Sequence, residues 1–206
     1  MTVRLHRADL PDDWTFGQSV AIDTETLGLE IGRDRLCLVQ LSRGDGDAEV
    51  VQIAAGQKSA QNLERLLADP TVVKLFHFGR FDMGVLCHAF GVMAGPVYCT
   101  KIASKLGRTY TDRHGLKDLT RELIGVEISK QQQSSDWGAE TLSDAQLAYA
   151  ASDVLHLHAL REKLDAMLKR EGRDGLAKAA FAYLPERVRL DLAGFGAMDV
   201  FSHGYP

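Results

Sequence analysis

The stretch Val20–Glu30, with the sequence Val-Ala-Ile-Asp-Thr-Glu-Thr-Leu-Gly-Leu-Glu, constrains the fold more than any other part of the chain. Its apolar beginning predicts a buried strand that leads directly into Asp23 and Glu25. Residues two positions apart in a strand point to the same face, so the two carboxylates would project together. They repel each other unless a cation lies between them, and Mg²⁺ or Mn²⁺ prefers such oxygen ligands. The alternative is a strand that ends in a solvated acidic turn.

Length and composition narrow the range of protein classes. The chain has 206 residues, of which 45% are hydrophobic, and this suits a single domain over residues 1–206 with a sizeable core. The net charge of −4 argues against a large surface for long duplexes but permits a local basic groove or a short substrate. No apolar run approaches the ~18 residues of a membrane span, so we expect no membrane partner.

The cysteines and the beginning of the chain indicate where the protein acts. Cys37, Cys87 and Cys99 lie in apolar contexts, and the sequence contains no C-x-x-C pair. This pattern is typical of reduced, buried thiols, with neither zinc nor disulfides. The first residues contain no apolar block of the signal-peptide kind. We therefore expect a cytoplasmic protein.

The hydrophobic pattern predicts an α/β fold with a mixed sheet of five to six strands and helices on both faces. A glycine-containing turn at Arg43–Asp47 makes its flanking strands antiparallel. A strand that follows a helical crossover is expected to be parallel to its neighbour. The expected strands are Val3–Leu5, Ser19–Asp23, Leu36–Ser42, Glu49–Ile53, Val72–His77 and Val97–Cys99.

The expected helices alternate with the later strands. Ser59 is a suitable cap for the first helix, and Ser143 with Gln146 forms a capping box at the start of the longest one. Pro185 is expected to end the last helix, and the apolar tail at about 185–206 is expected to dock on the core or on another subunit. The expected helices are Ala60–Ala68, Phe81–Ala89, Thr100–Leu106, Gly115–Ile124, Leu142–Arg170 and Leu176–Leu184.

Two further acidic positions occur in contexts that favour a site. His77–Asp82 follows a strand and enters a helix, where Asp82 lies in the first turn, although the helix dipole alone also favours an acid there. Tyr149 and Asp153 are four residues apart and share one face of a long helix. A carboxylate beside an apolar face needs a partner or a metal, whereas an exposed Tyr–Asp pair needs neither.

Together these motifs resemble a known constellation. Asp23 and Glu25 on a strand, Asp82 at a helix start, and Tyr149 with Asp153 on a late helix resemble the DEDD-type 3′→5′ exonucleases with an additional tyrosine. That family has the ribonuclease H-like (DnaQ-like) fold, and the resemblance covers about residues 15–170. The stretches that resemble the ribonuclease D branch, and more closely the nanoRNase C family that degrades very short RNAs, are Asp23–Leu29, His77–Asp82, Cys99–Leu116 and Ser129–Trp137.

The resemblance implies a metal-dependent hydrolysis. Asp23, Glu25, Asp82 and Asp153 would hold two divalent cations, Mg²⁺ or Mn²⁺, about 3.5–4 Å apart. Tyr149 completes the implied catalytic set; its phenol has a pKa near 10, which makes it a poor general base. It is therefore expected to orient the water or the scissile phosphate. The product would be a nucleoside 5′-monophosphate.

The expected substrate contacts surround these acids. Leu27 is expected to wedge against the terminal base, and His77 to donate a hydrogen bond to a sugar or phosphate. Basic residues and Tyr110 in Lys101–His114 suit phosphate binding and base stacking, or form a solvated surface. Trp137 is expected to pack beneath the site. The full expected set is Thr24, Leu27, His77, Gly79, Lys101, Arg108, Tyr110, Thr111, Arg113, His114, Lys130, Gln133 and Trp137.

The expected length of the substrate depends on how few residues follow Arg170. Ribonuclease D carries additional helical nucleic-acid-binding domains, for which the remaining residues are too few. We therefore expect short RNA as the substrate, with DNA also possible, and the resemblance implies a homo-oligomer that forms a ring. The alternatives are an exonuclease that trims longer structured RNA or DNA, and an inactive nucleic-acid-binding assembly subunit.

Overall fold

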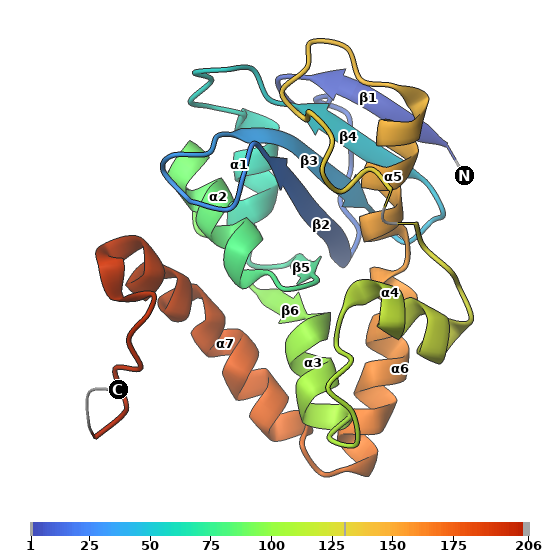
Figure 1. The fold of residues 1–206 in the computed structure, drawn as a ribbon, viewed down its shortest axis with the longest axis vertical. Coiled ribbons are helices and arrows are strands. Elements are labelled where there is room, and N and C mark those ends of the chain that lie inside the picture. The colour runs from blue at the N-terminus through green and yellow to red at the C-terminus, as the bar shows by residue number, and fades with distance from the viewer. Residues whose placement is uncertain (1, 130, 204–206) are drawn as a thin grey trace.

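A six-stranded mixed sheet forms the centre of the computed structural model, which describes residues 2–129 and 131–203 (Figure 1). Its strand order is β1-β4-β3-β2-β5-β6. Among these strands, β3 is antiparallel to both of its neighbours, and all other pairs are parallel. The strands are β1 (Val3–Arg7), β2 (Ser19–Thr26), β3 (Leu36–Ser42), β4 (Ala48–Gln52), β5 (Val73–Phe76) and β6 (Val97–Cys99).

The pairing confirms the expected topology. β3 and β4 form an antiparallel hairpin around residues 43–47, and β5, which follows a helix, pairs in parallel with β2. The strand β2 is longer than expected, because it continues beyond Asp23 through Glu25 to Thr26. The first two acids therefore belong to the strand itself, and pairing with β3 fixes their backbone on one side.

Helices cover both faces of the sheet, as the sequence predicts (Figure 1). One face, with Leu38 and Val50, packs against Ala150 of α5 and against Trp137. The other face, with Val39, packs against α1 and α2 in the larger apolar cluster. The helices are α1 (Gln61–Ala68), α2 (Arg80–Phe90), α3 (Thr100–Gly107), α4 (Leu116–Leu119) with the π-helical turn η1 (Thr120–Ile124) directly after it, α5 (Asp144–Leu155), α6 (Leu157–Arg170) and α7 (Asp174–Leu190).

Several expected helix boundaries are wrong. The predicted long helix is divided at His156, a single turn residue (φ −104°, ψ −5°) between α5 and α6. Ser59 does not cap α1, because Ala60 occupies the cap position and donates its N–H to Glu64 Oε1 at 2.8 Å. The capping box of Ser143 and Gln146 is confirmed.

Pro185 does not end the last helix. It lies inside α7, which continues to Leu190. A proline removes one backbone hydrogen bond, but Leu184 and Val188 on either side of it are buried. Contacts with α2, α3, α6 and β6 therefore keep α7 helical through the proline.

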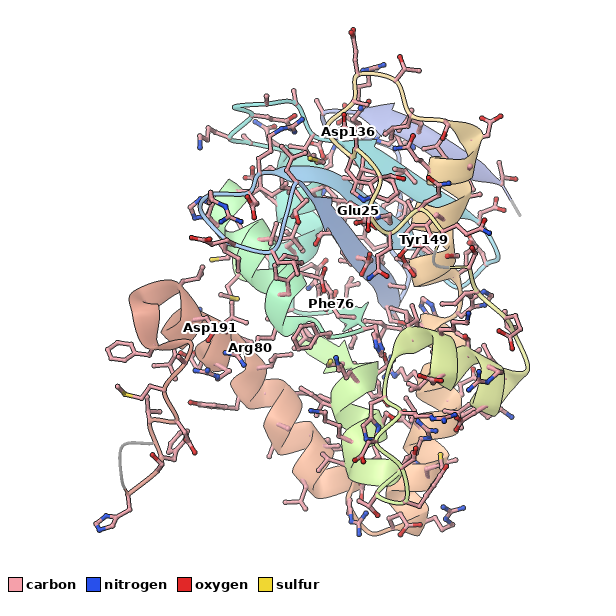
Figure 2. The ribbon with its side chains drawn as sticks, viewed as in Figure 1. Glu25, Phe76, Arg80, Asp136, Tyr149 and Asp191 are labelled. Carbon is pink, nitrogen blue, oxygen red and sulfur yellow. The ribbon has the colours of Figure 1, made fainter. Side chains whose placement is uncertain are left out.

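The C-terminal segment after α7 forms a π-helical turn (Asp191–Phe195) followed by turns, and it extends away from the sheet (Figure 1). Arg80 anchors its beginning, because its guanidinium donates to both carboxylate oxygens of Asp191 at 2.5 and 2.7 Å (Figure 2). Within the described residues, no helix has the length and apolar character needed to cross a membrane.

Candidate active site

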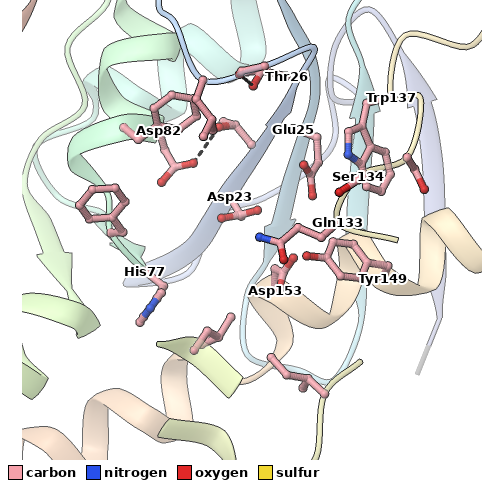
Figure 3. Close-up of a pocket in the computed structure, with 18 of the residues that line it drawn as sticks. Asp23, Glu25, Thr26, His77, Asp82, Gln133, Ser134, Trp137, Tyr149 and Asp153 are labelled. Carbon is pink, nitrogen blue, oxygen red and sulfur yellow. Dashed lines mark hydrogen bonds between the residues drawn. The ribbon is translucent and has the colours of Figure 1, made fainter. Parts of the chain in front are cut away.

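Asp23, Glu25 and Asp153 form a cluster of carboxylates between β2 and α5 (Figure 3). Asp23 and Glu25 share one face of β2 because they are two positions apart, and Asp153 projects from α5 above that face. One oxygen from each of the three side chains lies within 4.8 Å of the other two. The helix comes this close because the side chain that packs on Leu38 and Val50 of the sheet is the small, fully buried Ala150.

Asp82 joins this site from the other side of β2. Thr24 points to the α2 face of the strand, and its hydroxyl donates to Asp82 Oδ1 at 2.7 Å (Figure 3). Asp82 is only 4% exposed and lines the same pocket as the three clustered acids. Thr24 therefore holds Asp82 toward the cluster. The fold thus brings together all four acids that the sequence singled out.

The electrostatics of the four acids favour a bound cation. Burial, followed by the nearby charges of Asp82, Asp153 and Glu25, raises the pKa of Asp23 well above its usual value. Burial and the charges of Asp153 and Asp82 raise the pKa of Glu25 to about 8. Burial raises the pKa of Asp82 to about 7, although the Thr24 hydrogen bond opposes this shift. An all-oxygen donor set with so much uncompensated negative charge fits hard divalent cations such as Mg²⁺ or Mn²⁺.

Tyr149 lies beside the cluster, on the same face of α5 as Asp153 (Figure 3). Burial first, and then the neighbouring charge of Asp153, raises the pKa of its phenol, so the hydroxyl stays protonated at neutral pH. Trp137 supports the ring, with the two ring centroids 5.9 Å apart. Trp137 is 2% exposed and packs under the Tyr149 ring at the edge of the pocket.

The four acids line a pocket of about 640 Å³. Leu27, His77, Gln133 and Trp137 line it, together with the predicted acids, Thr24 and Tyr149. Phe78 was not identified from the sequence as a residue of the site. The lining residues that sequence reasoning missed are Thr26, Gly28, Leu29, Phe78, Phe81, Leu116, Lys117, Ile128, Ser129, Ser134 and Ser135.

His77 lines the pocket, and its Nδ1 atom contacts the Thr100 hydroxyl. Thr100 Oγ1 donates to the Phe76 carbonyl at 3.2 Å, so it accepts from His77 Nδ1 at 2.9 Å. Burial and the charge of Lys101 lower the pKa of His77 to about 3, which keeps the ring neutral. In this tautomer Nε2 is an acceptor, and the expected hydrogen bond from His77 to a sugar or phosphate stays a prediction.

Arg108 does not present a free charge to substrate. Its side chain is fully buried, and it donates to the Ser104 hydroxyl, the Arg113 carbonyl and the Glu122 carboxylate. The sequence expectation missed this role because the partners that neutralise Arg108 lie up to fourteen residues away. Through these hydrogen bonds Arg108 holds the basic segment Lys101–His114 in place.

Gly79 also has a structural role. A Cβ atom at this position would lie 2.6 Å from the Cβ of Phe76. The glycine therefore lets the turn before α2 pack on Phe76, and the expected close approach of a substrate backbone is not its reason.

Five further expected contacts are not among the residues that line the pocket. Tyr110 is 68% exposed, and His114 Nδ1 is 2.8 Å from the Ser104 hydroxyl. Lys130 lies outside the described residues. The contacts that stay predictions are those of Lys101, Tyr110, Thr111, Arg113 and His114.

Replacing Arg108 with Ala is expected to lower the free energy of unfolding by about 3 kcal/mol, because the buried Ser104 hydroxyl, the Arg113 carbonyl and the Glu122 carboxylate lose their partner. Arg121→Ala is the matched control. Its guanidinium is 40% exposed and pairs with Asp118 at 2.9 Å, so its loss should change stability by less than about 1 kcal/mol. Urea denaturation of both variants measures the difference, and equal effects would contradict the structural role of Arg108.

Gln40 is a further polar residue beside the acids. It pairs across the strands with Asp23 and is fully buried, and neither polar atom of its amide has a hydrogen-bond partner within the described residues. Directly opposed residues in an antiparallel pair share a face, so Gln40 lies on the α5 side of the sheet. Its position in the otherwise apolar run of β3 is the signal that sequence reasoning overlooked.

Comparison with known proteins places this site in a family. Residues 10–169 match the model of a family described as 3′-5′ exonuclease. Ribonuclease D of Gluconacetobacter diazotrophicus is 39% identical over 154 residues, which are 75% of this chain and 39% of that protein. The chain thus spans about two-fifths of the length of the curated ribonuclease D relatives that it matches.

Solved structures show the same architecture. Brucella melitensis NrnC is 61% identical with a TM-score of 0.95, covering 98% of this chain and 99% of that one. Structures of that protein with bound Mg²⁺ and bound to pGG are similar to the same degree, with TM-scores of 0.94 and 0.95. Escherichia coli RNase D is 26% identical with a TM-score of 0.74, over 84% of this chain and 45% of that one. The fold is the expected DnaQ-like exonuclease fold, and the chain belongs to the 3′-5′ exonuclease family.

Proposed function

We propose that this protein is a metal-dependent 3′→5′ exoribonuclease that hydrolyses dinucleotides and short oligoribonucleotides to nucleoside 5′-monophosphates. The observation that carries the proposal is the convergence of Asp23, Glu25, Asp82 and Asp153 in one pocket. Membership of the 3′-5′ exonuclease family supports the reaction type. The neighbouring structure bound to pGG supports a short substrate.

The four acids would hold two divalent cations, Mg²⁺ or Mn²⁺. Such ions supply positive charge for the phosphate oxygens and make a nucleophile available from water near neutral pH. Thr24 fixes Asp82 through its hydroxyl, so this acid stays aligned with the other three. Tyr149, protonated and supported by Trp137, would donate a hydrogen bond to the attacking water or the scissile phosphate.

The sugar and base would be held by other parts of the pocket. His77 Nε2 would accept a hydrogen bond from a ribose hydroxyl, since its Nδ1 proton is bonded to Thr100. Leu27 is 54% exposed at the pocket and would wedge against the terminal base. Gln133 is exposed and would contact the backbone of the same nucleotide.

The size of the pocket and the charge of the protein favour a short substrate. The pocket volume of about 640 Å³ lies within the range of small-molecule sites. The net charge is −4, and Arg108 in the basic segment is neutralised by Glu122. A long RNA is held mainly by many cationic contacts to phosphates. Trimming of longer structured RNA or of DNA is the alternative.

The test of this proposal is hydrolysis of a 5′-phosphorylated RNA dinucleotide. We expect conversion to nucleoside 5′-monophosphates with Mg²⁺ or Mn²⁺, loss of activity in EDTA, and recovery when the metal is returned. Chromatography identifies the product and separates 5′- from 3′-monophosphates. Binding of RNA without any hydrolysis in either metal would favour the alternative, an inactive assembly subunit.

We also propose that the protein acts in the cytoplasm as a homo-oligomer that forms a ring. Its three cysteines form no disulfide, and two of them are buried. Apolar side chains of the C-terminal segment are exposed, which is typical of an association surface. They are Leu192, Phe195, Met198, Val200 and Phe201.

The double variant Phe195→Ser and Phe201→Ser is expected to reduce the oligomer to smaller species, because it removes the two largest exposed side chains of this segment. Light scattering coupled to gel filtration measures the mass. Leu5→Ser, at an exposed position on β1, is the control. An unchanged mass in the double variant would contradict the role of the tail.

A further inference from the structure

Phe78 has a backbone conformation that bulky residues rarely adopt. It lies in the turn between β5 and α2, four residues before Asp82, and its φ is +66°. Steric contact between Cβ and the backbone disfavours this left-handed region for every residue except glycine, and asparagine tolerates it best among the others. An aromatic residue with φ in this range is therefore strained, and such strain gathers at functional sites.

The strain is not compensated by burial of the ring. Phe78 is 48% exposed, whereas Phe76, two residues earlier, is fully buried in the core. The ring of Phe78 instead lines the pocket that contains the four acids. The turn thus holds a large apolar surface in the solvent-accessible part of the site.

A cation lies over the same ring. The Lys101 ammonium is 4.2 Å from the ring centroid of Phe78, a favourable cation–π arrangement. Lys101 comes from α3, so an element other than the turn that carries Phe78 contributes to the position of the ring. An aromatic ring can stack on a nucleobase, and a positive charge beside the ring can contact the neighbouring phosphate.

From these observations we propose that Phe78 is a platform on which a base of the RNA substrate stacks, and that Lys101 holds the ring and contacts the adjacent phosphate. This inference rests on the proposed exonuclease function. It assigns a second base contact, separate from Leu27, which comes from the loop after β2. Two such contacts suit a substrate with two bases.

The backbone strain makes the proposal testable by stability and function together. Phe78→Asn removes the ring and places in the turn a residue that tolerates positive φ. If the ring serves substrate binding, the melting temperature stays constant or rises, while KM for a 5′-phosphorylated dinucleotide rises roughly tenfold to a hundredfold with kcat little changed. Phe78→Trp, which retains an aromatic surface, is expected to keep KM within about threefold of wild type. A ring needed only for folding would instead lower the melting temperature in Phe78→Asn.

Stacking itself is measured with a dinucleotide that contains 2-aminopurine, whose fluorescence is quenched when it stacks. Asp153→Asn serves as the common background, so that the probe is not hydrolysed. We expect quenching on binding, loss of quenching with Phe78→Asn, and quenching with Phe78→Trp. Leu176→Ala removes an exposed apolar residue on α7 and is expected to change nothing.

The outcomes separate this inference from the proposed function. If the wild-type protein hydrolyses the dinucleotide but Phe78→Asn has the same KM and the same quenching, the stacking platform is overturned and the exonuclease function stands. If the wild-type protein neither hydrolyses nor binds the dinucleotide, the proposed function itself fails.

Discussion

Replacing Asp153 with Asn is expected to abolish RNA hydrolysis and, in the same protein, to raise stability in the absence of metal. Activity should fall by roughly a thousandfold or more, because the variant loses a charged group that positions the metal and stabilises charge during reaction. Stability should rise by about 1–2 kcal/mol. The charge of Asp153 raises the pKa of both Asp23 and Glu25, so its removal relieves repulsion within the cluster.

Two measurements check this pair of effects. Dinucleotide hydrolysis with Mg²⁺ reports the loss of activity, and urea denaturation in EDTA reports the gain in stability. Glu162→Gln makes the same acid-to-amide change at an exposed position on α6 and should alter neither. Retained activity in Asp153→Asn would contradict the metal site, and a loss of stability would contradict the repulsion among its carboxylates.

The stability of the metal-free protein is expected to fall as the pH rises from 6.5 to 8. Folding raises the pKa of Glu25 from 4.5 to about 8 and that of Asp82 from 3.8 to about 7. Between these values the unfolded chain has lost protons that the folded chain still holds, so the free energy of unfolding decreases with pH. His77 acts in the opposite direction, but only below its ordinary pKa of 6.5, because folding lowers its pKa.

Divalent cations are expected to reverse this trend, because they bind the ionised carboxylates. The melting temperature in EDTA should fall by about 5 °C across this interval, and added Mg²⁺ or Mn²⁺ should raise it most at the upper end. Asp153→Asn should flatten the dependence. A melting temperature in EDTA that is constant or rises between these pH values would contradict the raised pKa values of the acids.

The sequence predicts the site well where local geometry decides it. The two-residue spacing of Asp23 and Glu25 and the four-residue spacing of Tyr149 and Asp153 each determine a shared face. The meeting of these faces in one pocket was predicted from the resemblance to the exonuclease family, because spacing alone does not bring distant elements together.

The predictions fail where distant contacts decide the structure. The apolar positions continue through His156, so the pattern does not show the break between α5 and α6. Pro185 stays helical because tertiary burial of its neighbours outweighs the missing hydrogen bond. Arg108 is buried because it pairs with Glu122 from a later segment. Phe78 has a left-handed backbone, which its aromatic side chain gives no reason to predict.

The turnover rate as a function of RNA length tests the central claim most directly. The substrates are 5′-phosphorylated RNAs from two to about twenty nucleotides, assayed with Mg²⁺ and with Mn²⁺ at a fixed salt concentration. A compact pocket on a protein of net negative charge predicts that kcat/KM is highest for the dinucleotide and falls steeply within the next few nucleotides. A 20-mer that is trimmed as fast as the dinucleotide would contradict it.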